Sequence, residues 1–146
     1  MALITPVFLI LAFGAVDLGN YFLSEHAVAK AVRDGARYAS RREFTQFTCA
    51  TVSDDVRDKT RNLVRTNSLD GTGTMRLNGW SDATTITVTV SCNTTFNAGI
   101  YTGVTGGAPV VTVTAAAPYS SLFNAFGITN STITLNAKAQ AAVMGA

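Results

Sequence analysis

The first 23 residues form an apolar run with a single carboxylate in it, and this run restricts the possible folds more than any other feature. Asp17 is the only charged residue between Met1 and Leu23. About 20 apolar residues are enough to span a bilayer as a helix. A secretory signal peptide would need a basic start and a small-residue cleavage site, but no basic residue precedes the apolar run. The run therefore predicts a membrane-spanning helix that contains one carboxylate.

The carboxylate of Asp17 has two interpretations. Either it lies at the membrane surface and faces water, or it pairs with a cationic group of a neighbouring helix, because intramembrane carboxylates are costly and usually have a partner. Gly14, Gly19 and Gly35 also have two interpretations: they occur by chance in an apolar helix, or they allow local unwinding or close contact with another helix. Pro6 is compatible with a helix either because it falls in the first turns or because neighbouring helices satisfy the carbonyl that it frees.

Helical periodicity continues beyond the apolar run. The stretch "SEHAVAKAVRDGARYASRR" places small and apolar residues on one stripe at a spacing of three to four, which predicts one long helix over roughly residues 2–41. A second, shorter helix is expected at about residues 53–66, where Ser53 can cap the N-terminus and two aspartates follow it. The expected stripe of the long helix consists of Val28, Ala31, Val32, Gly35 and Ala39.

Alternation of apolar and polar residues replaces the helical period later in the chain. "TTITVTVSC", "PVVTVTAAAPY" and "STITLNAKAQAAVMG" alternate as half-buried strands do, and a weaker strand is expected around Thr74–Leu77. Because no crossover helix separates the three stretches, they predict an antiparallel sheet. The fold class is therefore α+β, with a long N-terminal apolar helix and a short second helix packed on a small antiparallel sheet. The residues expected to face the helix stripe are Ile86, Val88, Val90, Val111, Val113, Ile133 and Leu135.

The composition excludes several classes of function. Charged residues make up 14% of the chain and the net charge is +2, too small to suggest a nucleic-acid partner. His26 is the only histidine, and neither cysteine has a Cys or His at metal-ligand spacing. We therefore expect no catalytic residues, no metal site, no cofactor and no enzymatic activity. Cys49 and Cys92 instead fit one disulfide formed in an oxidising compartment.

A long apolar N-terminal helix followed by a small antiparallel sheet is pilin architecture, and four segments carry a closer resemblance. "ALITPVFLILAFGAVDLGNYF", "AVRDGARYAS", "VVTVTAAAPYSSLF" and "STITLNAKAQAAVM" resemble TadE-like proteins, the pilin-like subunits of tight-adherence pili. The resemblance covers both ends of the chain, whereas residues 43–105 match poorly. The combination of Pro6, Asp17 and "DGARYA" makes the N-terminal part the most specific.

The resemblance implies that a prepilin peptidase removes a basic leader and that pilus assembly machinery moves the helix from the inner membrane into a filament. A leader also resolves a conflict of orientation. Lys30, Arg33 and three further arginines follow the apolar run, which would keep the C-terminal side in the cytoplasm, whereas a disulfide requires the opposite side. We therefore expect that a basic leader preceded Met1 and has been removed.

One position departs from the usual pilin pattern. Pilins usually carry a glutamate at the fifth mature position, where this chain has Thr5. In the TadE-like pattern the glutamate falls just before the "MAL" stretch, so that it would precede Met1. Alternatively, Met1 is the mature end and the chain is an atypical subunit.

The expected function is that of a structural subunit of an extracellular bacterial pilus-like filament, which polymerises with identical subunits and serves surface attachment. The alternative is a minor or tip-located pilin-like adhesion or priming protein anchored in the inner membrane, whose loops around Phe96–Gly107 and Ser120–Asn130 touch a surface.

Residues 1–42 would form the membrane and assembly helix, and residues 43–146 the extracellular part. We expect Asp17 to accept a hydrogen bond or ion pair from the N-terminal amine or a basic side chain of a neighbouring subunit. The other residues expected to act in assembly are Met1, Thr5, Pro6, Gly14, Gly19, Lys30 and Arg33.

Overall fold

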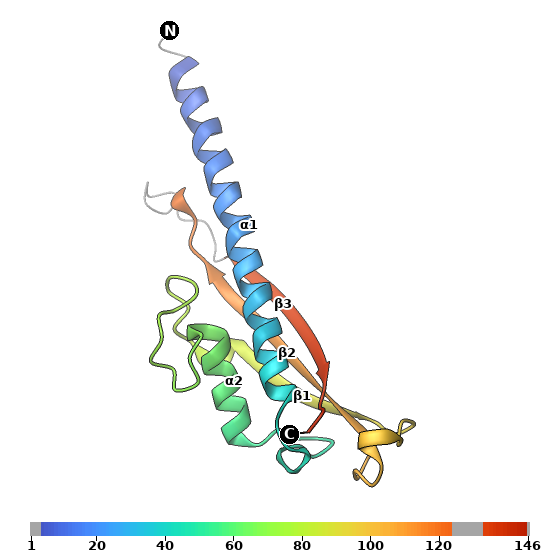
Figure 1. Ribbon diagram of the computed structural model, residues 1–146. Coiled ribbons are helices and arrows are strands. Elements are labelled where there is room, and N and C mark those ends of the chain that lie inside the picture. The colour runs from blue at the N-terminus through green and yellow to red at the C-terminus, as the bar shows by residue number, and fades with distance from the viewer. Residues whose placement is uncertain (1–3, 124–132, 146) are drawn as a thin grey trace.

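The chain forms a long helix whose second half packs, together with a short helix, on one face of a three-stranded antiparallel sheet (Figure 1). The structure is a computed structural model that describes residues 4–123 and 133–145. The expected α+β fold class is confirmed. The main elements are α1 (Ile4–Ser40), α2 (Asp54–Thr66), β1 (Ile86–Asn93), β2 (Ala108–Tyr119) and β3 (Ile133–Ala142), with single 3-10 turns at Phe44–Gln46, Ala83–Thr85 and Gly99–Tyr101.

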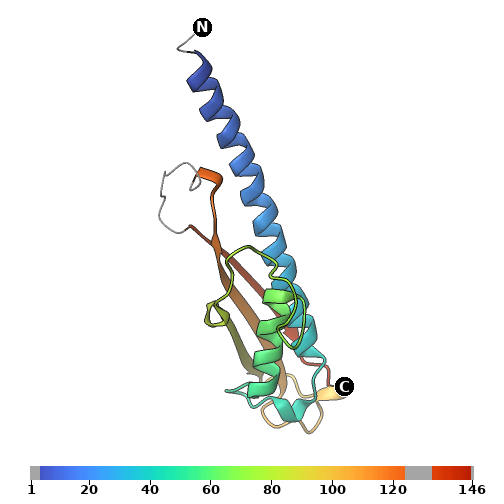
Figure 2. The same ribbon diagram turned by 90° about the vertical axis from the view of Figure 1, so that its left-hand side faces the viewer.

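The two halves of α1 have different surroundings. The N-terminal half projects beyond the sheet, and the C-terminal half lies against the sheet and α2 (Figures 1 and 2). The end of the helix is tied to the C-terminal part of the chain, because the Met144 N–H donates a hydrogen bond to the Ser40 carbonyl oxygen at 2.8 Å. The buried residues of α1 fall on one stripe, as the sequence predicts: Val28, Ala31, Val32, Gly35, Ala36, Ala39 and Ser40.

The second helix, α2, begins and ends at residues that favour a helix start and a helix end. Ser53 Oγ accepts a hydrogen bond from the Val56 N–H at 3.4 Å, and the first turn carries Asp54 and Asp55 next to the positive end of the helix dipole. The helix stops at Asn67, whose φ of 59° is left-handed, a conformation that asparagine tolerates better than most residues. The helix expected at about residues 53–66 is confirmed.

The sheet has the order β1-β2-β3 with an uninterrupted register. Val88 lies opposite Val113, and Val113 lies opposite Ala139, so that alternate residues of all three strands share the face toward the helices. This face is completely covered on the central strand. The β2 residues with 0% exposure are Val111, Val113, Ala115 and Ala117.

Ile133 departs from the expected core. It shares a face with Leu135, as the alternation predicts, but it is 40% exposed whereas Leu135 is 1% exposed. Ile133 begins β3 opposite Tyr119 and lines a groove with Leu18. The expectation that Ile133 packs on the later helix stripe is wrong, because β3 extends to the part of α1 that precedes this stripe.

The segment after α2 forms a loop and not the weak strand expected around Thr74–Leu77. The Arg76 N–H donates to the Arg65 carbonyl oxygen at 2.9 Å. The Arg76 guanidinium donates to Asp34 Oδ2 at 3.1 Å and to Asn67 Oδ1 at 2.6 Å. The strand expectation is wrong because these contacts hold Arg76 against the helices, so its backbone is not available to a neighbouring strand.

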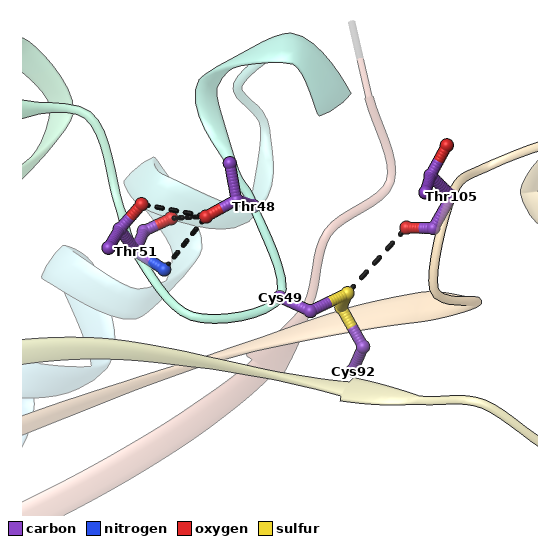
Figure 3. Close-up of a disulfide and its surroundings, with 5 residues drawn as sticks. All are labelled: Thr48, Cys49, Thr51, Cys92 and Thr105. Carbon is purple, nitrogen blue, oxygen red and sulfur yellow. Dashed lines mark hydrogen bonds between the residues drawn. A yellow bond between two sulfur atoms is a disulfide. The ribbon is translucent and has the colours of Figure 1, made fainter.

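The expected disulfide joins Cys49, in the link between the helices, to Cys92 near the end of β1 (Figure 3). Cys49 Sγ also lies 3.6 Å from the Thr105 carbonyl oxygen, so three separate segments meet there. This end of the domain is remote from the N-terminus of α1 (Figure 1). A cross-link between residues 43 positions apart stabilises a fold by about 3–4 kcal/mol on the chain-entropy model.

Gly35 allows α1 and α2 to approach each other, which leads to a prediction. A Cβ at this position would overlap Val64 Cγ2 and lie 3.3 Å from Thr60 Cγ2, and both residues are buried. We expect Gly35→Ala to lower the free energy of unfolding by about 1–3 kcal/mol, as overpacking does, in thermal or chemical unfolding in detergent micelles. The control is Gly19→Ala, where an added Cβ meets nothing within 4 Å. An equal loss in the two variants would contradict this account of helix packing.

Candidate assembly site around Asp17

The N-terminal half of α1, which projects beyond the sheet (Figures 1 and 2), has mostly exposed apolar side chains. By length and composition α1 is apolar enough to cross a membrane, and no residue of its most apolar 18-residue window is buried. Eleven large apolar residues of this half are 42–71% exposed: Ile4, Val7, Phe8, Leu9, Ile10, Leu11, Phe13, Val16, Leu18, Phe22 and Leu23. This half of the helix therefore requires an apolar environment that the described part of the chain does not supply.

Asp17 lies where the end of β2 reaches α1. Its carboxylate accepts three hydrogen bonds: from the Leu122 N–H to Oδ1 at 2.8 Å, from Ser121 Oγ to Oδ2 at 3.0 Å, and from the Tyr119 hydroxyl to Oδ1 at 3.1 Å. We call Asp17 and these three residues the Asp17 clamp. The donors follow Asp17 in the chain by 102 to 105 residues. The clamp therefore fastens the apolar helix to the part of the chain that contains α2 and the sheet (residues 43–123 and 133–145), which we call the outer domain.

Contacts with three residues of α1 hold the Tyr119 side chain in place. It lies 2.9 Å from the Asp17 carbonyl oxygen as well as 3.1 Å from Oδ1, so its proton is shared between the two acceptors. Asn20 Nδ2 donates to the same hydroxyl oxygen at 3.3 Å, and the Tyr119 ring meets the Tyr21 ring edge-on with centroids 5.2 Å apart. Burial raises the pKa of Tyr119, and the hydrogen bond to the Asp17 carboxylate raises it further. The hydroxyl therefore stays protonated and remains a donor.

The clamp satisfies the hydrogen-bonding capacity of Asp17 without neutralising its charge. All three donors are neutral groups, and none of the cations in residues 4–123 and 133–145 forms an ion pair with Asp17. Hydrogen bonds to a charged group contribute about 1.5–3 kcal/mol each. The sequence suggested either water or a neighbouring cation as the partner of Asp17; the structure adds the chain's own outer domain.

An apolar groove of about 430 Å³ opens beside the clamp. It lies between α1 and the adjoining ends of β2 and β3. Its lining residues are Gly14, Asp17, Leu18, Tyr21, Tyr119 and Ile133. The groove continues the apolar surface of the helix onto the end of the sheet.

Two of the basic residues expected to act in assembly are far from the clamp. Lys30 and Arg33 are exposed and follow Asp17 by 13 and 16 residues, which is roughly 20 and 24 Å along a helix. Neither forms an ion pair with a residue that the structure describes. Their expected contacts with Asp17 of a neighbouring subunit stay predictions.

The remaining expected assembly residues lie in or before the apolar half of α1. Thr5 and Pro6 occupy its first described turn, and Met1 lies outside the described residues. A Cβ added at Gly14 or Gly19 would meet no atom of the described residues within 4 Å, so neither glycine is needed for packing within residues 4–123 and 133–145. Close contact of these glycines with another helix stays a prediction. Of the Ser120–Asn130 loop expected to touch a surface, only residues 120–123 are described.

The sequence analysis missed the three donors of the clamp. Tyr119, Ser121 and Leu122 come directly at and after the end of an alternating stretch, in "PYSSL". Hydroxyl-rich residues at a strand end could have been paired with the lone carboxylate of the apolar helix, because buried polar groups need partners. A metal is a poorer candidate for this role: among the described residues, no group of three or more His, Cys, Asp or Glu side chains is placed to hold one.

The comparison with protein families agrees with the resemblance seen in the N-terminal helix. Residues 1–37 match the family described as TadE-like protein, which confirms that this segment is TadE-like. The match covers about a quarter of the chain, includes Asp17, and ends before α2 and the sheet. TadE-like pilins are structural proteins and not enzymes. No curated protein and no solved structure matches the chain.

The clamp predicts a specific effect of removing one hydroxyl. Tyr119→Phe keeps the ring against Tyr21 but deletes the donor to Asp17, so we expect the free energy of unfolding in detergent micelles to fall by about 1.5–3 kcal/mol. Tyr101→Phe is the matched control, because Tyr101 is 9% exposed, packs edge-on against Phe44 and Phe96, and has no hydrogen bond from its hydroxyl among the described residues. If Tyr101→Phe is as damaging as Tyr119→Phe, the hydroxyl of Tyr119 has no special role.

Proposed function

We propose that the chain is a structural subunit of an extracellular bacterial pilus-like filament and polymerises through the N-terminal half of α1. The observation that carries this proposal is the apolar half-helix with eleven exposed large apolar residues, which extends from a disulfide-bonded outer domain. The TadE-like match to residues 1–37 supports it, because this match covers the same half-helix.

The free energy of burying apolar side chains favours two environments for this helix over water. Burying one Val, Leu, Ile or Phe side chain contributes about 1.5–3 kcal/mol, and eleven large apolar residues are exposed here. A bilayer supplies such an environment before assembly, and a bundle of identical helices supplies it in a filament. Lipid and helix bundle are similarly apolar, so the apolar surface alone does not choose between them.

A charged group can favour the helix bundle over lipid, and Asp17 is such a group. Its carboxylate keeps its negative charge inside the clamp, and Oδ2 accepts only one of the described hydrogen bonds. We propose that a cation of a neighbouring subunit, from its N-terminal amine, Lys30 or Arg33, approaches this carboxylate. Such a contact would set the axial position of each incoming subunit, as buried polar residues set register in coiled coils.

The proposed route starts in the inner membrane. A prepilin peptidase would remove a basic leader, and pilus assembly machinery would transfer the helix from the bilayer to the filament. The disulfide between Cys49 and Cys92 supports an outer domain on the oxidising side of this membrane.

A second candidate function is that of a minor or tip-located adhesion or priming protein. It is favoured by an apolar surface at the end of the outer domain remote from the N-terminus, where Phe96 and Ile100 are 50% and 58% exposed. Their loop is held by the disulfide region and by Tyr101, whose ring meets that of Phe96. An anchored tip protein would present such a surface to its target.

Imaging of material sheared from cells tests the proposal. Cells that express the chain together with a prepilin peptidase and pilus assembly proteins should release filaments in which this chain is the most abundant protein. A tip protein would be present in trace amounts relative to the filament protein. Cells that retain the processed chain in the membrane and form no filament containing it would contradict the filament-subunit function and leave the membrane-anchored priming protein.

Asp17→Ala tests the proposed contact between subunits. We expect the variant to insert normally into the membrane but to yield about tenfold less filament, the factor that about 1.4 kcal/mol produces in one equilibrium. Tyr119→Phe is the control, since it weakens the clamp but keeps the charge. Normal yield from Asp17→Ala would refute the contact, and an equal loss in both variants would assign the effect to the clamp alone.

A further inference from the structure

We propose that, in the membrane-anchored protein, the end of the sheet that carries the Asp17 clamp rests in the outer interface of the bilayer. The partner is the headgroup and upper acyl region of phospholipids. This inference rests on the proposed membrane-anchored stage and adds a second membrane contact to the spanning helix. The outer domain would then lie directly on the membrane, with no free stretch of helix between them.

The position of the clamp along α1 determines how deeply the end of the sheet enters the bilayer. The apolar run ends at Leu23, which is six residues after Asp17, or about 9 Å along the helix. A hydrocarbon core of about 30 Å needs about 20 residues, and residues 4–23 provide that length. The clamp holds the end of β2 against residues 17–21 of the helix. When the apolar run is embedded, Asp17 and Tyr119 therefore lie up to about 9 Å below the outer boundary of the hydrocarbon core, in the acyl region beneath the headgroups.

The side chains at this end of the sheet suit an interface. Leu122 and Ile133 are 42% and 40% exposed, and Leu18 of the adjacent helix is 55% exposed. Tyr21 and Tyr119 lie edge-on to each other beside them. Tyrosine is enriched at membrane–water interfaces because its ring is apolar and its hydroxyl is polar. The apolar surface of α1 thus continues without a break onto the outer domain.

Few charges lie near this end of the sheet: they are Asp17 and, in a pocket that Tyr119 also lines, Arg76, which pairs with Asp34. The sequence has no charged residue between Asp82 and Lys138, a stretch that contains all of β1 and β2 and the first half of β3. Asp17 is the only charged residue of α1 before Glu25. Leaving such a group without hydrogen bonds where water is scarce costs several kcal/mol. The clamp supplies the donors that water would otherwise provide.

The test measures how deeply two exposed positions enter a bilayer. Leu122→Cys and Ile100→Cys are labelled with an environment-sensitive fluorophore, and the native cysteines do not react because they are bonded to each other. Ile100 is the matched control, because it is more exposed than Leu122 but lies at the remote end of the domain. The full chain is reconstituted in phosphatidylethanolamine–phosphatidylglycerol vesicles, with and without lipids that carry a nitroxide near the top of the acyl chain.

We expect nitroxide lipids to quench the label at position 122 strongly and the label at position 100 hardly at all. The label at position 122 should also be shielded from iodide in the aqueous phase. Equal lipid quenching at the two positions would overturn the inference while leaving the spanning helix intact. Shielding of position 122 from both lipid and iodide would show that a second copy covers it, which also overturns the lipid contact. Extraction of the chain by alkaline carbonate would overturn the membrane-anchored stage itself, and the inference with it.

Discussion

The hydrogen bonds to the Asp17 carboxylate are the interaction that holds the apolar half of α1 to the rest of the molecule. The buried stripe of α1 packs the C-terminal half of the helix on the sheet and α2, but it ends before the apolar half begins. Three donors at and just after the end of β2, at 2.8 to 3.1 Å, supply a second point of attachment and join residues more than 100 positions apart. Because hydrogen bonds are directional, the clamp fixes both the height of the sheet along α1 and the face of α1 that it meets.

A carboxylate held in this way can accompany the helix from one apolar environment to another. An unpaired carboxylate in lipid would be expensive, and a carboxylate that depended on water for its hydrogen bonds would lose them when the helix entered a bundle. The donors of Asp17 belong to the same chain, so they move with it. What remains is the charge, which the neutral donors do not cancel. The clamp thus lowers the cost of carrying the carboxylate and keeps its attraction for a cation.

The sequence predicted the elements because each has a strong local pattern. The helical stripe from Val28 to Ala39, the Ser53 cap and the alternation in β1 and β2 depend only on near neighbours, and they were confirmed. The weak strand around Thr74–Leu77 failed because Arg76 is held by Asp34 and by the end of α2, contacts that no local pattern reveals. Alternation assigned Ile133 to the correct face, but it could not show where along α1 that face would lie. The donors of the clamp were missed for the same reason: they are distant in sequence.

The distribution of cations suggests how charge and shape share the task of placing a neighbouring subunit. Lys30, Arg33 and Arg37 are all exposed and follow one another by three or four residues, so they form one row along α1, and Arg41 follows directly after the helix. The steps between them are roughly 4.5–6 Å. One carboxylate could meet such a row at several heights with similar Coulomb energy. The proposed ion pair would therefore set the axial position of a neighbouring subunit only together with a contact that depends more steeply on distance. Apolar packing against the groove beside Asp17, lined by Leu18 and Ile133, has that property, because a gap of about 1 Å already removes much of the dispersion attraction.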